Sequence, residues 1–154
     1  MPAHRARLAE LGLVLPAVAA PLAAYVPAVR SGSLVWTSGQ LPLVNGALAV
    51  TGKVGSDLQP DQAAELAKVC ALNALAAIDD LVGLDAVLRV VKVVGYVASS
   101  PEFTGQPAVV NGASEFLGRL FGDAGRHARS AVGVAVLPLN APVEVELVVE
   151  VDAA

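Results

Sequence analysis

One arginine, Arg129, lies in a segment that otherwise consists mainly of valine, alanine and glycine. Burying a guanidinium without a partner is very costly, so this side chain must reach solvent or meet a carboxylate. Its planar fork of donors also suits the carboxylate of a small ligand. Two carboxylates, Glu144 and Glu146, share one face of the next valine-rich segment. The residue pattern leaves two alternatives open: a structural ion pair with one of these glutamates, or an arginine that binds a ligand.

Other catalytic classes lack their residues in this sequence. The chain has two histidines and one cysteine, Cys70, which lies on the expected buried stripe of a helix. A catalytic zinc site normally uses three ligands of these types or carboxylates, so we expect no metal site. A hydrolase built on His127 would need Ser38 or Ser130 as its nucleophile, and neither has the glycines of a nucleophile elbow. Gly39 is not followed by the further glycines of a nucleotide-binding loop.

The elements that must position these residues follow from hydrophobic periodicity. Apolar residues at three- and four-residue spacing predict helices over 59–82 and 106–121, each with one buried stripe. Strand composition and turn residues predict strands at 34–37, 48–50, 87–97, 127–138 and 143–149. The last two are expected to form a hairpin. The order β-β-α-β-α-β-β indicates an α+β fold in which two helices cover one face of a mixed sheet.

Composition limits the assembly and the partners. The 154 residues are enough for a single domain, 1–154, with its own core. Hydrophobic residues make up 55% of the chain and charged residues only 16%, which favours a homo-oligomer that buries apolar surface between subunits. The net charge of −4 argues against binding to nucleic acid.

The apolar run over 11–29 needs separate attention, because such a run is also typical of a signal peptide or a membrane span. Pro16, Pro21 and Pro27 interrupt it and predict an extended arm instead. We therefore expect residues 1–28 to form a short helix and a proline-rich arm, with no membrane partner. A single cysteine fits a reducing compartment, so a cytoplasmic location is expected.

Several motifs carry a resemblance to a known family. They are Tyr25-Val26, Trp36-Thr37-Ser38-Gly39-Gln40-Leu41-Pro42, Val110-Asn111-Gly112-Ala113, Ala128-Arg129-Ser130, Leu137-Pro138 and Val143-Glu144-Val145-Glu146. From about Pro21 to Val151 the chain resembles the RidA/YjgF family, whose members are also called endoribonuclease L-PSP or translation initiation inhibitor proteins. The resemblance implies a chorismate-mutase-like α+β subunit assembled as a homotrimer, with sites in clefts between subunits.

For the active members, the resemblance implies hydrolysis of reactive enamines and imines, such as 2-aminoacrylate, to 2-keto acids and ammonia without a cofactor. Arg129 takes the place of the arginine that holds the substrate carboxylate. Glu144 takes the place of the carboxylate that orients or activates the attacking water. Positions that line the family's cleft are matched by Tyr25, Ser38, Gly39, Asn111 and Ala131.

Departures from the family pattern indicate a divergent subgroup. Ala131 stands where many members have a cysteine, so it can act through its backbone but not as a thiol. The alternative to a deaminase is therefore a non-enzymatic trimer that binds small carboxylates or a protein partner. Ribonuclease activity follows only from the family's label, and the acidic charge disfavours it.

Structural interpretations also stay open for several of the matched positions. Ser38 and Gly39 can serve as a strand-ending turn, and Asn111 can bond a helix end. Tyr25 can pack the arm. His127 is interpreted as a residue at the edge of a strand rather than as a proton shuttle.

Overall fold

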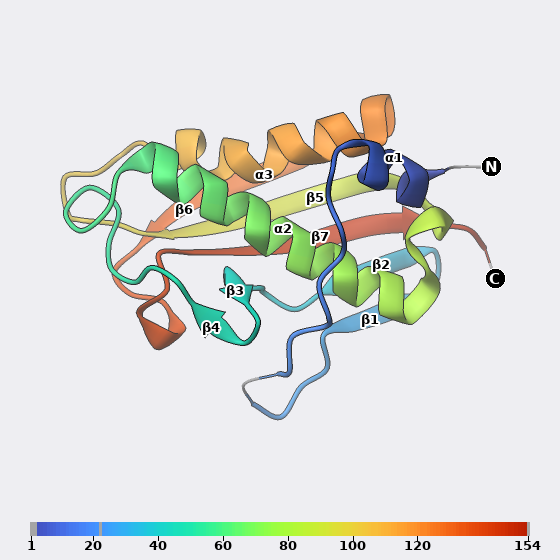
Figure 1. Cartoon of the computed structure of the whole chain (residues 1–154), viewed down its shortest axis with the longest axis horizontal. Helices are drawn as coiled ribbons and strands as arrows, with labels where there is room; N and C mark the ends of the chain where they lie inside the picture. The colour runs from blue at the N-terminus through green and yellow to red at the C-terminus, as the bar shows by residue number, and fades with distance from the viewer. Residues whose placement is uncertain (1–2, 22, 154) are drawn as a thin grey trace.

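The computed structural model describes residues 3–21 and 23–153. Its α-helices and strands are α1 (His4–Glu10), β1 (Ala28–Ser31), β2 (Leu34–Thr37), β3 (Leu43–Val44), β4 (Ala47–Leu48), α2 (Pro60–Val82), β5 (Val87–Ala98), α3 (Gln106–Phe121), β6 (Ala128–Val134) and β7 (Val143–Val151). Short 3₁₀ turns occupy Leu84–Ala86, Gly122–Gly125 and Pro138–Asn140. Figure 1 shows the two long helices lying across the strands.

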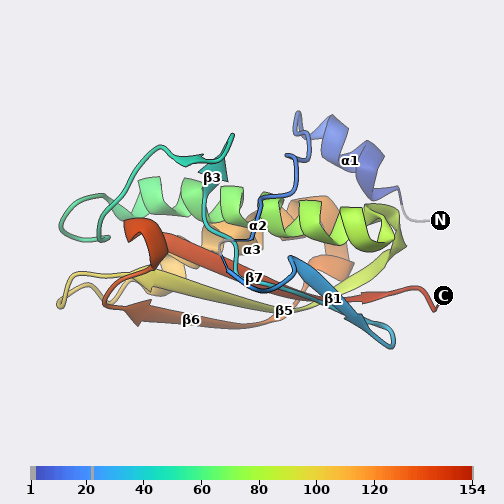
Figure 2. The ribbon, with the colours of Figure 1, turned by 90° about the horizontal axis from the view of Figure 1, so that it is seen from below.

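Five strands form one mixed sheet in the order β1-β2-β7-β5-β6, and β3 pairs only with β4. β6 runs parallel to β5, whereas the other neighbours are antiparallel. Figure 2 shows α2 and α3 together on one side of this sheet. The opposite face carries no helix in the described part of the chain. The predicted α+β fold, with helices on one face of a mixed sheet, is confirmed.

Two glycines let α3 approach its neighbours closely enough to position the site. A Cβ atom at Gly112 of α3 would fall 1.8 Å from the carbonyl oxygen of Ala64 in α2. A Cβ atom at Gly95 of β5 would fall 2.4 Å from Cγ2 of Val110. Because no real side chain tolerates such contacts, these glycines allow α3 to lie directly on α2 and on the sheet.

The predicted terminal hairpin is wrong. β6 and β7 do not pair with each other, because β5 lies between them. β5, α3 and β6 instead form a parallel crossover unit, in which the apolar face of the helix covers the two strands. The chain then returns through Pro138–Asn140, and β7 pairs with the other edge of β5. Arg129 and Glu144 are therefore not on neighbouring strands.

The N-terminal region also differs from the expected layout. β2 pairs with β1, a strand that begins at Ala28 and turns at Gly32. Asn45 and Gly46 form the predicted turn with positive φ angles of 52° and 80°, but their hairpin stays outside the main sheet. The expectation for 1–28 includes residues 1, 2 and 22, which lie outside the described residues. Among the described helices, none is both long and apolar enough to cross a membrane.

Candidate functional site

Arg129 lies on the edge strand β6, on the face of the sheet that the helices cover. Its register partner on β5, Val93, is fully buried beneath them. The guanidinium lies against α3: Nη1 donates to Oδ1 of Asn111 at 2.7 Å and to Oγ of Ser114 at 3.3 Å. Nη2 donates to the carbonyl oxygen of Pro107 at 3.4 Å. We call these four residues the arginine edge.

The contacts of Arg129 count against one of the two alternatives that the sequence left open, the structural ion pair. All three acceptors are neutral, and neither salt bridge recorded among the described residues involves Arg129. The structural ion pair with Glu144 or Glu146 is therefore not formed within one copy of the chain. A guanidinium has five N–H donors. Nε–H and one hydrogen of Nη2 have no partner in the described part of the chain, and this side of the fork can bind a carboxylate through two parallel hydrogen bonds.

Asn111 and Ala131 complete this region. Asn111 lies within α3 rather than at its end, and its side-chain oxygen accepts from Arg129, so it does not cap a helix. Gly95 makes this contact possible, because it brings the adjacent Val110 onto the sheet. Ala131 follows Arg129 on the same face of β6 and packs partly against the core.

Glu144 lies on β7 and points to the uncovered face of the sheet. Its neighbours Val143 and Val145 are fully buried on the other side, as alternation along a strand requires. A Cβ atom at Gly39 would fall 2.7 Å from Oε2 of Glu144, so the carboxylate lies directly against the backbone of Gly39. Burial raises the pKa of Glu144 above its usual range, and the negative charge of Glu146 raises it further.

Glu146 is held by a separate partner. The hydroxyl of Tyr96 donates to Oε1 of Glu146 at 2.8 Å. This hydrogen bond, with smaller effects of burial and of both glutamates, raises the pKa of Tyr96 to about 12. Tyr96 therefore stays protonated and occupies Glu146, whereas the carboxylate of Glu144 is left beside Gly39.

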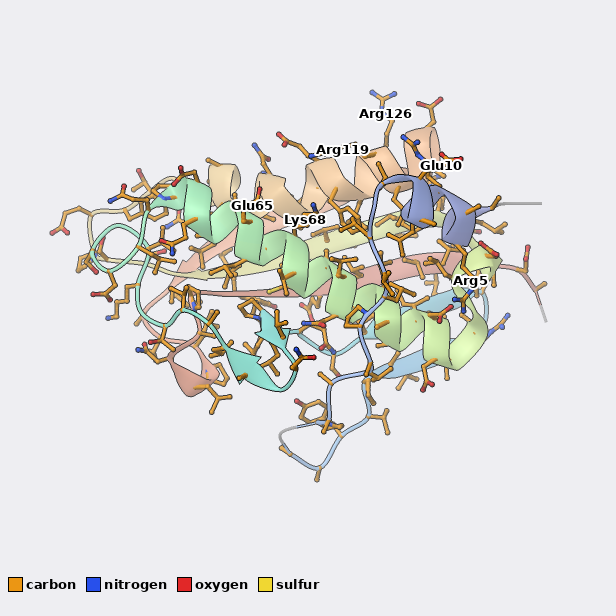
Figure 3. All side chains as sticks on the ribbon, in the orientation of Figure 1. Arg5, Glu10, Glu65, Lys68, Arg119 and Arg126 are labelled. Atoms are coloured by element: carbon orange, nitrogen blue, oxygen red, sulfur yellow. The ribbon has the colours of Figure 1, made fainter. Side chains whose placement is uncertain are left out.

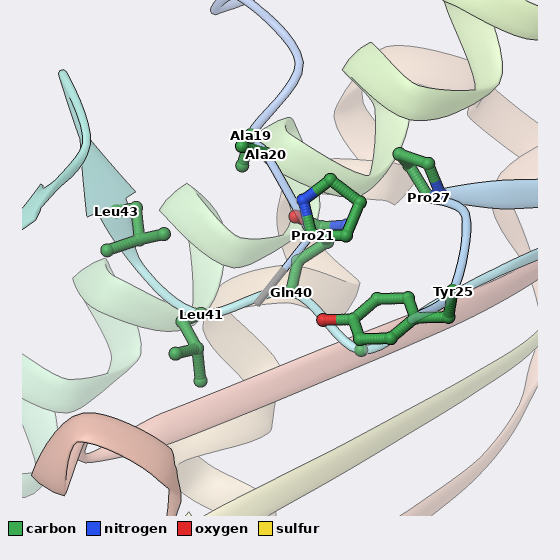
Figure 4. A pocket seen from close by; sticks show the side chains of 9 residues that line it. Ala19, Ala20, Pro21, Tyr25, Pro27, Gln40, Leu41 and Leu43 are labelled. Carbon is green, nitrogen blue, oxygen red and sulfur yellow. The ribbon is translucent and has the colours of Figure 1, made fainter. Parts of the chain in front are cut away.

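A small pocket lies between the N-terminal arm and the loop that follows β2 (Figure 4). Tyr25 and Gly39 both line it, and Figure 4 shows the ring of Tyr25 extending over this loop with its hydroxyl end toward Gln40. Ser38 joins the arm to the strand, because its Oγ donates to the carbonyl oxygen of Val26 at 2.6 Å. We call Tyr25, Ser38, Gly39 and Glu144 the glutamate shelf.

The loop that follows Gly39 is held by hydrogen bonds from α2. Asn73, which is buried in α2, donates from Nδ2 to the carbonyl oxygens of Leu41 and Leu43 at 3.0 Å each. The side chain thus holds the segment after Gly39 in place.

The predicted site residues therefore form two groups rather than one. Arg129, Asn111 and Ala131 lie on the helix-covered face at the β6 edge, and Tyr25, Ser38, Gly39 and Glu144 lie across the sheet, with Glu144 on the uncovered face. Strand β5 separates β6 from β7. A single copy of the chain does not bring Arg129 and Glu144 together.

Sequence reasoning missed the role of two residues beside Arg129. The sequence patterns do not single out Ser114, and they favour a strand-edge role for His127. In the structure, Oγ of Ser114 lies 2.9 Å from Nε2 of His127, and Nδ1 of His127 lies 2.6 Å from the carbonyl oxygen of Gly125. The available signal was the spacing of Asn111 and Ser114, because polar residues three apart share one face of a helix.

The single cysteine of the chain, Cys70, forms no disulfide. Cys70 is fully buried in α2, where burial first and the charge of Glu144 second raise the pKa of its thiol well above the usual range. A thiol in this state is a packing group rather than a nucleophile. In 3–21 and 23–153, no cluster of three or more His, Cys, Asp or Glu side chains could hold a metal ion.

The sequence of this chain is similar to that of known proteins. A family model described as "YjgF/chorismate mutase-like, putative endoribonuclease" matches residues 5–151. Protein TCP17 of Trypanosoma cruzi is 46% identical over 149 residues, which cover 96% of this chain and 93% of that protein.

Solved structures show the same fold. A protein of unknown function from Agrobacterium tumefaciens is 46% identical with a TM-score of 0.89, over 97% of this chain and 92% of that one. A "putative endoribonuclease" from Shewanella oneidensis MR-1 is 34% identical with a TM-score of 0.93, over 96% and 99%. E. coli TdcF with bound serine is 26% identical with a TM-score of 0.62, over 90% and 96%. The first two structures are thus much closer in shape to this chain than TdcF is.

Proposed function

The chain belongs to the YjgF/chorismate mutase-like family, and from this premise we propose that it hydrolyses reactive enamines and imines to 2-keto acids and ammonia. The substrates are small 2-imino acids of the 2-iminobutanoate type and their enamine forms, such as 2-aminoacrylate. The observation that carries the proposal is the side of the Arg129 guanidinium that α3 leaves without a partner. A 2-imino acid presents a planar carboxylate to that side. TdcF binds serine, which has the same carboxylate next to a carbon that bears nitrogen.

The chemistry requires an oriented water and a group that handles a proton. The carbon of a C=N bond is already electrophilic, so a strong nucleophile is not needed. Water forms a C–O bond to this carbon, the C=N π electrons move to nitrogen, and the proton of the water passes to Glu144. This proton then moves to nitrogen, which gives a carbinolamine. Glu144 next takes the hydroxyl proton as the C=O bond forms and the C–N bond breaks, and it delivers this proton to the departing nitrogen, which leaves as ammonia. The hydrolysis is redox-neutral and balances with one water.

A carboxylate with a raised pKa suits this role. Glu144 is half-buried against Gly39, and its pKa is raised by burial and by Glu146. A proton acceptor whose pKa is closer to neutral returns its proton to the nitrogen more readily than an ordinary surface carboxylate does. Arg129 in this scheme binds and orients, and Glu144 moves the proton.

The assembly follows from the separation of the two groups. We propose a homotrimer in which the arginine edge of one copy meets the glutamate shelf of the next, because one copy cannot bring both to a small substrate. Each copy is a single domain with residues 1–28 as its arm. Trp36 and Val132 are 51% and 41% exposed on the uncovered face, which supports burial of that face between copies. Closed cyclic symmetry then gives three equivalent sites.

Trapping of a short-lived imine tests the activity. 2-Iminobutanoate is generated in situ, and its decay is followed as the semicarbazone. Wild type should accelerate the decay, and Arg129→Lys should raise KM by about tenfold or more, because Lys lacks the bidentate fork. Arg126→Lys is the matched control, since this exposed arginine three residues earlier points away from the ribbon in Figure 3. Decay no faster with wild type than without protein would show that the proposed activity is wrong, and equal accelerated rates for wild type and Arg129→Lys would show that Arg129 does not bind the substrate.

A second function is favoured by one observation, the alanine at position 131. Ala131 supplies only a methyl group and its backbone beside Arg129, so a thiol role in turnover is absent at this position. If 2-keto acids bind in an Arg129-dependent way and no imine is hydrolysed, the protein is a carboxylate-binding module. The net charge of −4 makes RNA a poor ligand, and RNA cleavage that is lost in Arg129→Lys would reverse that conclusion.

A cytoplasmic location is part of the same proposal. It is supported by the single cysteine, Cys70, which is buried and free.

A further inference from the structure

We infer that Ser114 and His127 are positioning residues that hold the guanidinium of Arg129 in its carboxylate-binding orientation. The inference rests on the proposed function for the class of ligand, a small 2-keto or 2-imino acid. It is carried by a continuous chain of hydrogen bonds from Gly125 through His127 and Ser114 to Arg129, with lengths of 2.6, 2.9 and 3.3 Å. Neither Ser114 nor His127 lies on the side of Arg129 that is left without a partner.

The carbonyl oxygen of Gly125 sets the tautomer of a neutral His127 ring, and this tautomer sets the direction of the other hydrogen bonds in the network. The carbonyl of Gly125 can only accept, so Nδ1 of His127 carries the hydrogen. In the neutral ring, Nε2 must then accept, and the hydroxyl of Ser114 is its donor. The lone pairs of that hydroxyl oxygen are left to accept from Nη1 of Arg129. The tautomer here follows from the network of partners.

The residue at which this series of hydrogen bonds starts, Gly125, lies in a rigid part of the fold. Gly125 is buried, and a Cβ atom there would fall 2.5 Å from the carbonyl oxygen of Leu117. The turn that carries Gly125 is therefore pressed against α3, the same helix that carries Ser114. The two partners of the His127 ring, Gly125 and Ser114, are thus both held by α3.

Ser114 and Asn111 together determine the rotation of the guanidinium. Both accept from Nη1 of Arg129, so they define the plane of the fork from two directions. With Ser114 absent, Nη1 keeps only Asn111, and Nη2 keeps only its long 3.4 Å contact with the carbonyl oxygen of Pro107. The fork can then rotate more freely, and binding of a carboxylate must supply the free energy that orders it. The expected loss is in binding of the carboxylate and not in the proton transfer at Glu144.

Binding of 2-oxobutanoate, measured by calorimetry on the full-length protein, tests this inference without any turnover. Ser114→Ala and His127→Ala should each raise the Kd of 2-oxobutanoate by about three- to tenfold. Ser114→Thr should bind it nearly as wild type does, because it keeps the hydroxyl. Ser114→Ala should still fold, since alanine is the best helix former. Ser56→Ala, in an exposed turn, is the matched serine control.

A neutral ligand and a kinetic split separate positioning from general damage. The methyl ester of 2-oxobutanoate lacks the charge that Arg129 recognises, so its weak binding should be the same in wild type and in both alanine variants. With 2-iminobutanoate, the two variants should raise KM by a similar three- to tenfold and change kcat by less than about twofold. Equal weakening of acid and ester would overturn the inference, because it would indicate a loss of structure.

The outcomes also distinguish this inference from the proposed function. If Ser114→Ala and His127→Ala bind 2-oxobutanoate as wild type does while Arg129→Lys does not, the inference is wrong and the proposed function stands. If both alanine variants weaken the acid selectively but no imine is hydrolysed, the inference stands and the deaminase is wrong. If Arg129→Lys leaves the affinity unchanged, Arg129 does not bind the carboxylate and the inference is wrong with it.

Discussion

The arginine edge and the glutamate shelf are built in opposite ways. At the arginine edge a permanent charge is held by neutral acceptors of a single helix, α3, and one side of it is left without a partner. At the glutamate shelf a titratable group is pressed against the backbone of Gly39, and burial raises its pKa. The first arrangement keeps a charge fixed and available, whereas the second makes a charge easier to neutralise.

This difference separates binding from chemistry. A cation that never titrates suits recognition of a carboxylate, and a carboxyl with a raised pKa suits proton transfer. Arg129 and Glu144 point to opposite faces of one sheet, so in the proposed trimer they would meet only between copies. Changes in one region should therefore affect KM, and changes in the other should affect kcat.

The largest expected effect comes from mixing two impaired variants. With substrate kept below the wild-type KM, Arg129→Lys should lose most of its rate through the raised KM, and for Glu144→Gln the loss in kcat should be about a hundredfold or more. If a site takes its arginine from one copy and its glutamate from the next, refolding an equal mixture should restore about a quarter of the sites in a trimer. Deaminase rates before and after co-refolding measure this recovery.

The control for mixing uses two variants of the same region. Arg129→Lys co-refolded with Arg129→Ala should show no recovery, because no copy supplies an intact arginine edge. If Arg129→Lys and Glu144→Gln also fail to rescue each other although the mixed trimer forms, the two regions do not build a shared site.

A smaller effect is expected at Gly39. The Cβ atom of Gly39→Ala would fall 2.7 Å from Oε2 of Glu144, so the flexible carboxylate must move. Since a displacement of about 1 Å can cost up to about a hundredfold in rate, kcat should fall by about ten- to a hundredfold with KM nearly unchanged. Gly118→Ala in α3, where an added Cβ meets nothing within 4 Å, is the control. A rise in KM at constant kcat would contradict the division of roles.

The smallest effect concerns pH. Glu144 accepts a proton only when ionised, so activity should be lost as pH falls through its raised pKa. Burial is the larger cause of that raised value and the charge of Glu146 the smaller one. Glu146→Gln removes the smaller cause and should move the acidic limb of the kcat profile to lower pH. Glu150→Gln, on the same strand, should leave the limb in place; a shift toward higher pH in Glu146→Gln would contradict the assignment.

The sequence predicts the parts of the fold that local patterns determine. The stripes of α2 and α3 and the turn at Asn45-Gly46 are visible as periodicity and turn chemistry, and they agree with the structure. The pairing of β6 and β7 is not a local property. Both strands are rich in valine and lie close in sequence, so a hairpin satisfies the same pattern. The packing of α3 on the sheet at Gly95 and on α2 at Gly112 favours the crossover instead.

In the candidate site, too, local sequence identifies individual residues but not their relative positions. The charge on an apolar strand identifies Arg129 without knowledge of the fold, and the motifs identify Glu144. That they lie on opposite faces depends on the position of β5, which their own sequences do not encode. The role of Ser114 depends on contacts between α3 and the segment around His127, thirteen residues later.

The position of β7 has a consequence for synthesis of the protein. It is the last strand in chain order, yet it occupies the middle of the sheet between β2 and β5. The β1–β2 ribbon and the β5–α3–β6 unit therefore have no shared hydrogen bonds until translation has passed Val151. During elongation both pieces expose unpaired strand edges, which is when a chain is most prone to misassociate. Folding of this subunit is thus a closing step made by its final strand, and the glutamate shelf forms in that same step.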